Sequence, residues 1–127
     1  MPLVYDASAL LAVVFSEPGA EIVIGRLAEA GGEVSAANLA EVGSKMAEHG
    51  VSTNQIQREL ASFALEIVPL DESQALVVAG LRVQTRVLGL SLGDRCCLAL
   101  ALTRGATAVT ADRSWKKLKG FDIELIR

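Results

Sequence analysis

Ser91–Trp115, SLGDRCCLALALTRGATAVTADRSW, carries one carboxylate before an apolar segment and a second carboxylate after it. Ser91 and Asp94 form an S-x-x-D pattern, which is typical of the start of a helix. That helix is predicted over Arg95–Thr103, and we expect it to be buried because its residues are apolar nearly all round. Asp112 follows a short apolar strand. Each acid therefore lies where a backbone element begins or ends, and both could face one cleft.

Outward from this stretch, strands alternate with helices along the whole chain. This order favours one α/β domain, residues 1–127, with a mostly parallel sheet. The predicted strands are Leu3–Tyr5, Val34–Ala36, Glu66–Leu70, Thr107–Thr110 and Ile123–Ile126. The predicted helices are Ala7–Phe15, Glu21–Ala30, a segment from an Asn38 cap to His49, Gln55–Ala64, a long helix from an Asp71 cap through Arg86, Arg95–Thr103 and Asp112–Leu118.

The composition indicates a globular protein with a substantial core: 51% of the 127 residues are apolar, 21% are charged, and the net charge is -3. A negative balance argues against a general nucleic-acid binder, although it does not exclude an enzyme that holds nucleic acid through metal ions. Cys96 and Cys97 are adjacent, so we expect reduced thiols and a cytoplasmic protein. No basic leader precedes the first apolar run, and no apolar run reaches about 20 residues, so no membrane segment is expected.

Four acidic side chains are predicted to reach one edge of the sheet. Asp6 follows the first strand and Asp112 follows the fourth, while Glu41 and Asp94 lie at the starts of two helices. Sites in parallel sheets form outside the carboxyl ends of the strands. Carboxylates gathered there repel one another, and oxygen ligands of this kind select Mg²⁺ or Mn²⁺. Such a metal ion activates water and stabilises a phosphodiester transition state, which is nuclease chemistry.

Most of these acids also have a possible structural role. Acids at helix starts are favoured by capping and by the helix dipole, which accounts for Glu41 and Asp94. Asn38 is a plausible N-cap, with Glu41 at the third helical position. Asp112 could cap the short helix that follows it. Asp6 has no such explanation, because it comes directly after an apolar strand.

Four motifs stand in order along the chain: VYDASALL (Val4–Leu11) followed by Glu17–Gly19, ANLAEV (Ala37–Val42), LSLGDRCCLALA (Leu90–Ala101) and VTADRSW (Val109–Trp115). They resemble the motifs of PIN-domain proteins, specifically the VapC-type ribonuclease toxins of toxin–antitoxin pairs. The resemblance covers nearly the whole chain. It departs at Arg95, where many relatives carry a small residue, and at Trp115, where Phe is common. No further acid lies between Asp112 and Asp122, so the number of metal ions stays open.

The resemblance implies a PIN-like three-layer α/β/α sandwich with a mostly parallel central sheet of four or five strands. It implies a Mg²⁺- or Mn²⁺-dependent endoribonuclease that acts as a toxin, with an RNA substrate, a cognate antitoxin and a homodimeric state. The site residues that it implies are the ligands Asp6, Glu41, Asp94 and Asp112, with Ser8 and Thr110 in supporting positions.

Basic residues beside these acids are candidates for contacts with substrate. Arg113 begins a cluster with Lys116, Lys117 and Lys119, which either contacts RNA phosphates or is a solvated helix end. Arg95 either holds a substrate phosphate or pairs with a neighbouring carboxylate, and the pairing is favoured. His49 is expected to cap a helix C-terminus.

The sequence also allows functions other than nuclease activity to be considered, and it argues against most of them. A non-catalytic PIN-like domain that binds RNA or a partner stays possible, although the complete set of four acids argues against it. A phosphohydrolase with Asp6 as nucleophile usually has an acid two residues later, where this chain has Ser8. A receiver-like signalling domain would need a paired acid and a late lysine that the sequence does not supply. No glycine-rich phosphate loop supports nucleotide binding.

Overall fold

Five parallel strands form the central sheet of the computed structural model, which describes residues 2–127. The strand order is β3-β2-β1-β4-β5, and every pairing is parallel. The central strand β1 is buried along its whole length, as expected for a parallel strand that helices cover on both faces. The strands are β1 (Leu3–Tyr5), β2 (Glu33–Ser35), β3 (Glu66–Val68), β4 (Thr107–Thr110) and β5 (Asp122–Leu125).

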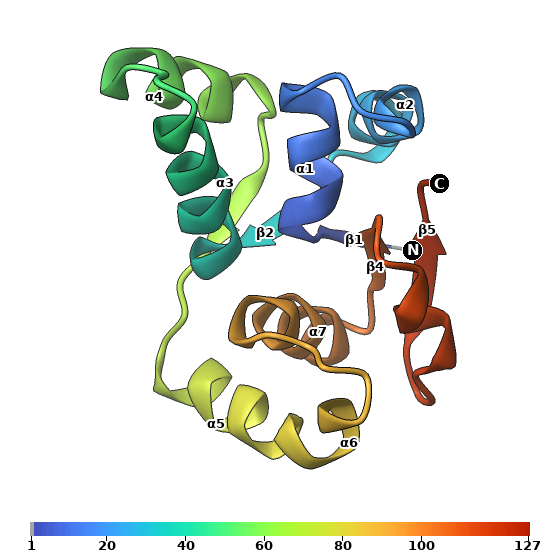
Figure 1. The fold of residues 1–127 in the computed structure, drawn as a ribbon. Coiled ribbons are helices and arrows are strands. Elements are labelled where there is room, and N and C mark those ends of the chain that lie inside the picture. The colour runs from blue at the N-terminus through green and yellow to red at the C-terminus, as the bar shows by residue number, and fades with distance from the viewer. Residues whose placement is uncertain (1) are drawn as a thin grey trace.

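Helices lie on both faces of this sheet and complete the predicted α/β/α sandwich (Figure 1). On one side are α1 (Ala7–Val14), α2 (Ala20–Ala30), α3 (Ala36–Glu48) and α4 (Thr53–Ser62). On the other side are α5 (Glu72–Gly80), α6 (Arg82–Arg86) and α7 (Leu92–Arg104), and a 3-10 helix η1 (Arg113–Lys117) joins β4 to β5. Across residues 2–127, no helix combines the length and the apolar character needed to cross a membrane.

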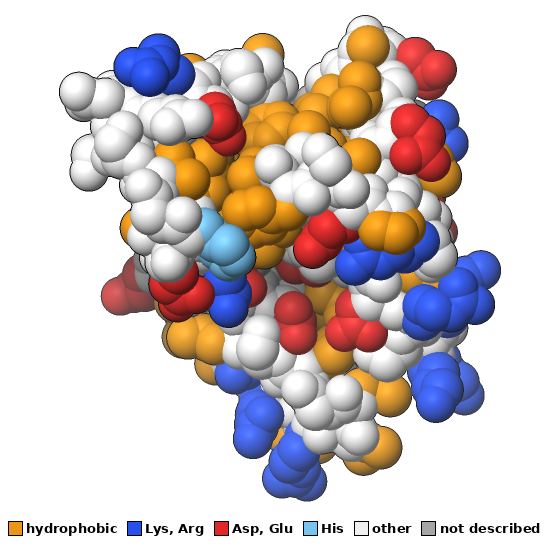
Figure 2. Space-filling model, turned by 45° about the horizontal axis from the view of Figure 1, so that its top comes forward, with side chains coloured by type: hydrophobic (Ala, Val, Ile, Leu, Met, Phe, Trp, Pro, Cys, Tyr) orange, Lys and Arg blue, Asp and Glu red, His pale blue; other side chains and the backbone are white. Residues whose placement is uncertain are grey.

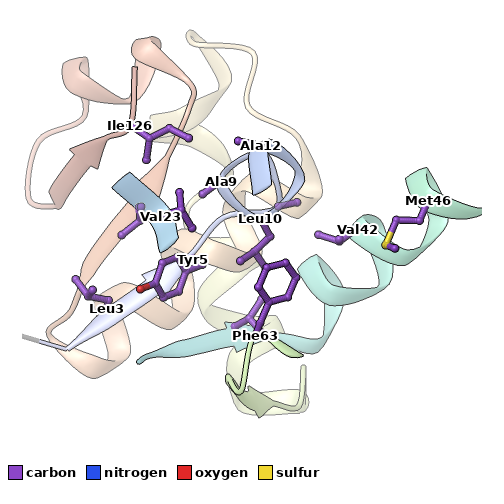
Figure 3. Packing of buried hydrophobic residues seen from close by; sticks show 13 residues of the cluster. Leu3, Tyr5, Ala9, Leu10, Ala12, Val23, Val42, Met46, Phe63 and Ile126 are labelled. Atoms are coloured by element: carbon purple, nitrogen blue, oxygen red, sulfur yellow. The ribbon is translucent and has the colours of Figure 1, made fainter. Parts of the chain in front are cut away.

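Two apolar clusters form the core, one on each face of the sheet. The first lies between the sheet and α1 to α4, and it includes Leu10, Val42 and Phe63 (Figure 3). The second surrounds α7, whose residues Cys96–Ala101 are all buried, as the sequence predicts. Trp115 lies in this second cluster with no exposed surface, so the tryptophan that replaces the family's common Phe is a core residue. Both cysteines are free thiols.

Three local predictions are wrong, each because a neighbouring contact outweighs a sequence preference. The long helix to Arg86 is two helices that meet at Leu81, whose backbone N–H is shared between the Val77 and Val78 carbonyls, a tight turn after Gly80. Asn38 is not the N-cap of α3, because Ser35 occupies that position and accepts a hydrogen bond from the Ala37 amide.

The third error concerns the inward face of α2. The spacing of apolar residues in the sequence predicts that Ile22 points inward, but 37% of its surface is exposed. Val23 is the buried residue of that helix instead. The helix begins at Ala20, after Gly19, whose backbone packs directly on Ile126. That contact fixes how α2 is turned about its axis, and sequence periodicity does not record it.

The register of β1 on β4 decides where the first and last acidic motifs meet. Val4 pairs with Ala108 and Tyr5 pairs with Val109, so the residue after β1 lies beside Thr110. The Asp6 amide continues this ladder by donating to the Val109 carbonyl at 2.9 Å. Residues more than 100 positions apart in sequence are thus brought together at the carboxyl ends of two central strands.

Candidate functional site

Asp6 lies at the carboxyl end of β1, where it is 3% exposed. Its Oδ2 atom accepts hydrogen bonds from the Ser8 hydroxyl at 2.7 Å and the Thr110 hydroxyl at 2.9 Å. Asp6 stands at the N-cap position of α1, yet its side chain makes no capping hydrogen bond. Capping therefore does not explain this acid, in agreement with the reading of its sequence position.

Burial and neighbouring acids change the ionisation of Asp6. Desolvation raises the pKa of its carboxyl from the ordinary 3.8 to about 6, although the hydrogen bonds from Ser8 and Thr110 act in the opposite direction. The negative charges of Asp94 and Glu41 make smaller contributions to this raised pKa. Acids from three separate motifs therefore influence one another across the sheet edge. A carboxyl with such a raised pKa in a polar cluster is typical of functional sites.

Ser8 and Thr110 also connect Asp6 to the fourth motif. The Ser8 hydroxyl accepts a hydrogen bond from the Ala111 amide at 2.9 Å, and the Thr110 hydroxyl accepts one from the Asp112 amide at 3.1 Å. The two hydroxyl oxygens lie 3.2 Å apart. The backbone that carries Asp112 is thus fixed relative to Asp6 by two hydroxyls.

Asp112 caps η1, as one of the two interpretations of the sequence had it. Its Oδ1 atom accepts hydrogen bonds from the Ser114 amide at 2.9 Å and the Ser114 hydroxyl at 2.7 Å. Both bonds fall on one oxygen. Among the described residues, no hydrogen bond to the Oδ2 atom of Asp112 is recorded, so that oxygen is available to another ligand.

Asp94 opens α7 through a complete capping box with Ser91. The Asp94 amide donates to the Ser91 hydroxyl at 3.1 Å, and the Ser91 amide donates to the Asp94 Oδ2 atom at 2.8 Å. The S-x-x-D pattern is thus confirmed as a helix start, and the helix begins at Leu92. This arrangement uses one carboxylate oxygen and fixes the direction of the other.

Glu41 reaches the start of α7 from α3. A side chain at Gly93 would place its Cβ 2.5 Å from the Glu41 Oε1 atom, so the carboxylate lies directly on the glycine backbone, next to Asp94. Burial raises the pKa of Glu41, the charge of Asp94 raises it further, and the amide of Asn38 and the charge of Lys45 lower it. Because Gly93 has no side chain, the carboxylate of Glu41 in the second acidic motif can lie against the backbone there.

Asn38 is a site residue whose role the sequence reading missed. It is fully buried, and its Nδ2 atom donates to the Gly93 carbonyl at 2.8 Å, which ties α3 to the start of α7. Its Oδ1 atom has no hydrogen-bond partner within residues 2–127. Asn38 lies three residues before Glu41 and so on the same helix face, which is the one sequence signal that could have identified it.

The donor chemistry of this site fits a hard divalent cation. The four candidate ligands are all carboxylates: Asp6 follows β1, Asp112 follows β4, and Glu41 and Asp94 lie at the start of α7. Figure 2 shows acidic side chains gathered near the middle of the face that it presents. Within residues 2–127, however, no three acidic, histidine or cysteine side chains stand in positions that could hold one metal ion.

The two candidate arginines point away from these acids. Arg95 donates from Nη1 to the Val78 carbonyl at 3.1 Å, and within the described chain it pairs with no carboxylate. The favoured prediction of a carboxylate pair for Arg95 is therefore wrong, because the side chain extends toward α5. Arg113 is exposed and donates to the Arg127 carbonyl at 3.1 Å. His49 caps α3, with its Nδ1 atom 2.9 Å from the Lys45 carbonyl, as predicted.

Comparison with known proteins identifies the family and the fold. The family model described as the PIN domain matches residues 3–120. Among solved structures, VapBC2 from Rickettsia felis bound to promoter DNA matches with a TM-score of 0.75 and 20% identity, over 98% of both chains. A toxin–antitoxin complex from Klebsiella pneumoniae matches with a TM-score of 0.77 and 17% identity, also over 98% of both chains. FitAcB from Neisseria gonorrhoeae matches with a TM-score of 0.69 and 19% identity, over 98% of this chain and 97% of that chain. No curated protein matched the sequence.

Proposed function

The chain belongs to the PIN-domain family, and from this premise we propose that it is a Mg²⁺- or Mn²⁺-dependent endoribonuclease that acts as the toxin of a toxin–antitoxin pair. Nuclease activity is the chemistry of this family, and PIN-domain nucleases generally use divalent metal ions. The finer parts of the proposal concern this chain: the metal, the RNA substrate, the residues that hold them and the protein that restrains the enzyme.

The observation that carries this proposal is the electrostatic coupling of Asp6, Glu41 and Asp94. The charges of the other two acids raise the pKa of buried Asp6, although they lie on different elements and far apart in sequence. Like charges placed close together do not stabilise the fold, because each charge raises the free energy needed to ionise the others. In a cation site the same arrangement is favourable, because the bound cation stabilises the ionised form of each carboxylate.

We assign the metal to Asp6, Glu41, Asp94 and Asp112. When bound, a divalent cation lowers the pKa of water and stabilises the charge that develops on the phosphate. The Ser8 and Thr110 hydroxyls hold one oxygen of Asp6, so its other oxygen faces a fixed direction. The Ser91 amide does the same for Asp94. These contacts pre-organise the ligands before metal or RNA binds.

The test is cleavage of single-stranded RNA by the purified protein, with Mg²⁺ or Mn²⁺ and with EDTA. Asp6→Asn keeps the size of the side chain and removes its charge. Asp122→Asn is the matched control, because Asp122 is exposed at the start of β5. We expect cleavage only with metal, its loss in Asp6→Asn and its retention in Asp122→Asn.

Two outcomes would contradict the nuclease proposal in different ways. Cleavage in EDTA, or full activity of Asp6→Asn, would show that the acids do not act through a metal ion. RNA binding without cleavage at any metal concentration would favour the alternative of a non-catalytic PIN-like domain. One observation favours this alternative: within residues 2–127, no three acidic, histidine or cysteine side chains are placed to hold one metal ion.

An apolar groove between α1, α2 and α4 suits the antitoxin partner. A cavity of about 330 Å³ there is lined by residues that include Val13, Ile24 and Phe63. Figure 2 shows apolar side chains along a hollow between two lobes of the molecule. Ile24 is 53% exposed, an unfavourable arrangement for a large apolar side chain without a partner. We infer that an apolar segment of the antitoxin binds in this groove, so Ile24→Asp should weaken the complex when both are co-purified.

Self-association is proposed at a separate surface. Leu76 of α5 is 68% exposed and Leu102 of α7 is 48% exposed, on two helices that pack against each other. Measurement of molar mass by light scattering tests the homodimer, and Leu76→Asp should shift a dimer toward monomer. A monomeric wild-type protein at micromolar concentration would contradict this assignment.

A further inference from the structure

Basic side chains are concentrated on one surface beside the acidic site, although the whole chain has a net charge of -3. Residues 73–93 and 113–121 contain no aspartate or glutamate. These two stretches carry half of the twelve basic residues, and in the described chain none of the six takes part in a salt bridge. All six are exposed: Arg82, Arg86, Arg113, Lys116, Lys117 and Lys119. Figure 2 shows Lys and Arg side chains along the lower and right edges of the molecule, around the acids.

A cavity of about 400 Å³ lies within this basic surface, between α6 and η1. The ends of these two elements line the same cavity. The lining combines three kinds of group: the apolar residues Val87, Leu88 and Leu118, the amide of Gln84, and the ammonium groups of Lys117 and Lys119. Its volume is in the range of small-ligand sites.

Val87 is the least expected member of this lining. It is 91% exposed, the largest exposed fraction among the large apolar residues of the described chain. Val87 follows the last residue of α6 and precedes the turn at Gly89, so the fold holds an apolar side chain at the surface of a cavity that two lysines also line. Apolar side chains beside two ammonium groups suit a ligand that has flat apolar faces and negative charge on either side of them.

We propose that this cavity binds one unpaired nucleobase of an RNA strand, with the adjoining phosphates on Lys117 and Lys119. The inference rests on the proposed function, and it adds a binding site for substrate outside the acidic cluster. The base packs on Val87, Leu88 and Leu118, and the Gln84 amide supplies both a donor and an acceptor for the edge of the base. The strand must be single, because bases inside a duplex are stacked and paired.

The position of η1 connects this cavity to the site of cleavage. Asp112 caps η1, and Lys117 is its last residue. Five residues at a rise of about 2 Å each place the two roughly 10 Å apart along the helix. A strand whose scissile phosphate lies at the acids thus reaches the cavity within a few nucleotides. Substrate preference would then depend on a base that is not next to the cleaved bond.

The test measures binding of a fluorescent single-stranded RNA of about 12 nucleotides in EDTA, so that no metal-dependent cleavage occurs. Lys117→Gln and Lys119→Gln each remove one positive charge. We expect each single variant to reduce the size of the slope of log K against log salt by about 0.7, and the double variant to reduce it by about 1.4. At about 0.1 M salt, the double variant should therefore bind the RNA roughly 25-fold more weakly than wild type. Arg58→Gln is the control, since Arg58 is exposed on α4, away from this surface.

A neutral variant tests the apolar part of the cavity separately. Val87→Asn should weaken binding by up to about tenfold with no change in the salt slope. The effect should disappear when the RNA carries abasic sites in place of bases. Val83→Asn is the matched control, because Val83 is on the same helix and 71% exposed but does not line the cavity.

The outcomes separate this proposal from the nuclease proposal. Wild-type protein that binds RNA but never cleaves it, with Val87→Asn weakened, supports the base site and contradicts the nuclease. Protein that cleaves RNA, with the lysine variants and Val87→Asn equal to their controls in binding, overturns the base site alone. A change of oligomeric state in Val87→Asn, with RNA binding intact, would overturn it also and would identify the surface as a contact between two copies of the chain.

Discussion

Replacing Asp6 by asparagine should stabilise the metal-free protein at neutral pH, even though it abolishes the proposed activity. Burial holds the pKa of Asp6 near 6 in the folded state, compared with 3.8 for an ordinary aspartate. The folded protein therefore retains this proton more tightly than the unfolded chain does. Stability is highest below the unfolded pKa and falls as pH rises from about 4 to about 6.

The size of this effect follows from the two pKa values. A difference of about 2 corresponds to roughly 3 kcal/mol of unfolding free energy that is lost once Asp6 is ionised in both states. Asparagine has no charge to desolvate, and its oxygen can still accept the hydrogen bonds of Ser8 and Thr110. Asp6→Asn should therefore be about 3 kcal/mol more stable than wild type at about pH 8, and nearly equal to it at about pH 4.

Urea unfolding in EDTA at several pH values measures this difference. Asp122→Asn serves again as the control, because Asp122 is exposed and its replacement should give no such trend. Added Mn²⁺ should raise the unfolding free energy of wild type by about 2.7 kcal/mol at a metal concentration a hundred times Kd. It should not raise that of Asp6→Asn. The reasoning is refuted if Asp6→Asn is less stable than wild type at pH 8 in EDTA, or if the difference does not depend on pH.

Three further substitutions test the contacts around the acids. Ser91→Ala removes the capping box of α7 and should cost about 0.5–2 kcal/mol, measured by urea unfolding. Gly93→Ala places a Cβ where the Glu41 carboxylate lies, so it should lower Mn²⁺ affinity in calorimetry, whereas Gly25→Ala, where the new Cβ meets no atom within 4 Å, should not. Thr110→Val deletes a hydroxyl that holds two motifs together and should cost about 2–4 kcal/mol, and an unchanged thermal midpoint would contradict that role.

Much of the architecture follows from local patterns. The S-x-x-D start of α7, the apolar run after it and the strand Thr107–Thr110 are all found where the sequence predicts them. Helix caps and short apolar strands depend on residues a few positions apart, so they can be read from a linear pattern. The break at Leu81 has only a weak local signal, because Gly80 disfavours a helix but a single glycine does not by itself end one.

The sequence by itself predicts which acids form the site, because the four motifs stand in a specific order and Asp6 lacks a local structural role. Only the tertiary structure decided where these acids lie relative to one another. The register of β1 on β4 sets Asp6 beside Thr110, and the contact of Glu41 with Gly93 sets the second motif against the third. The charge coupling of these acids depends on distances between residues that are remote in sequence, and strand pairing and helix packing fix such distances. For the same reason, the basic cavity between α6 and η1 could not be read from the sequence, since its two walls come from segments about 30 positions apart.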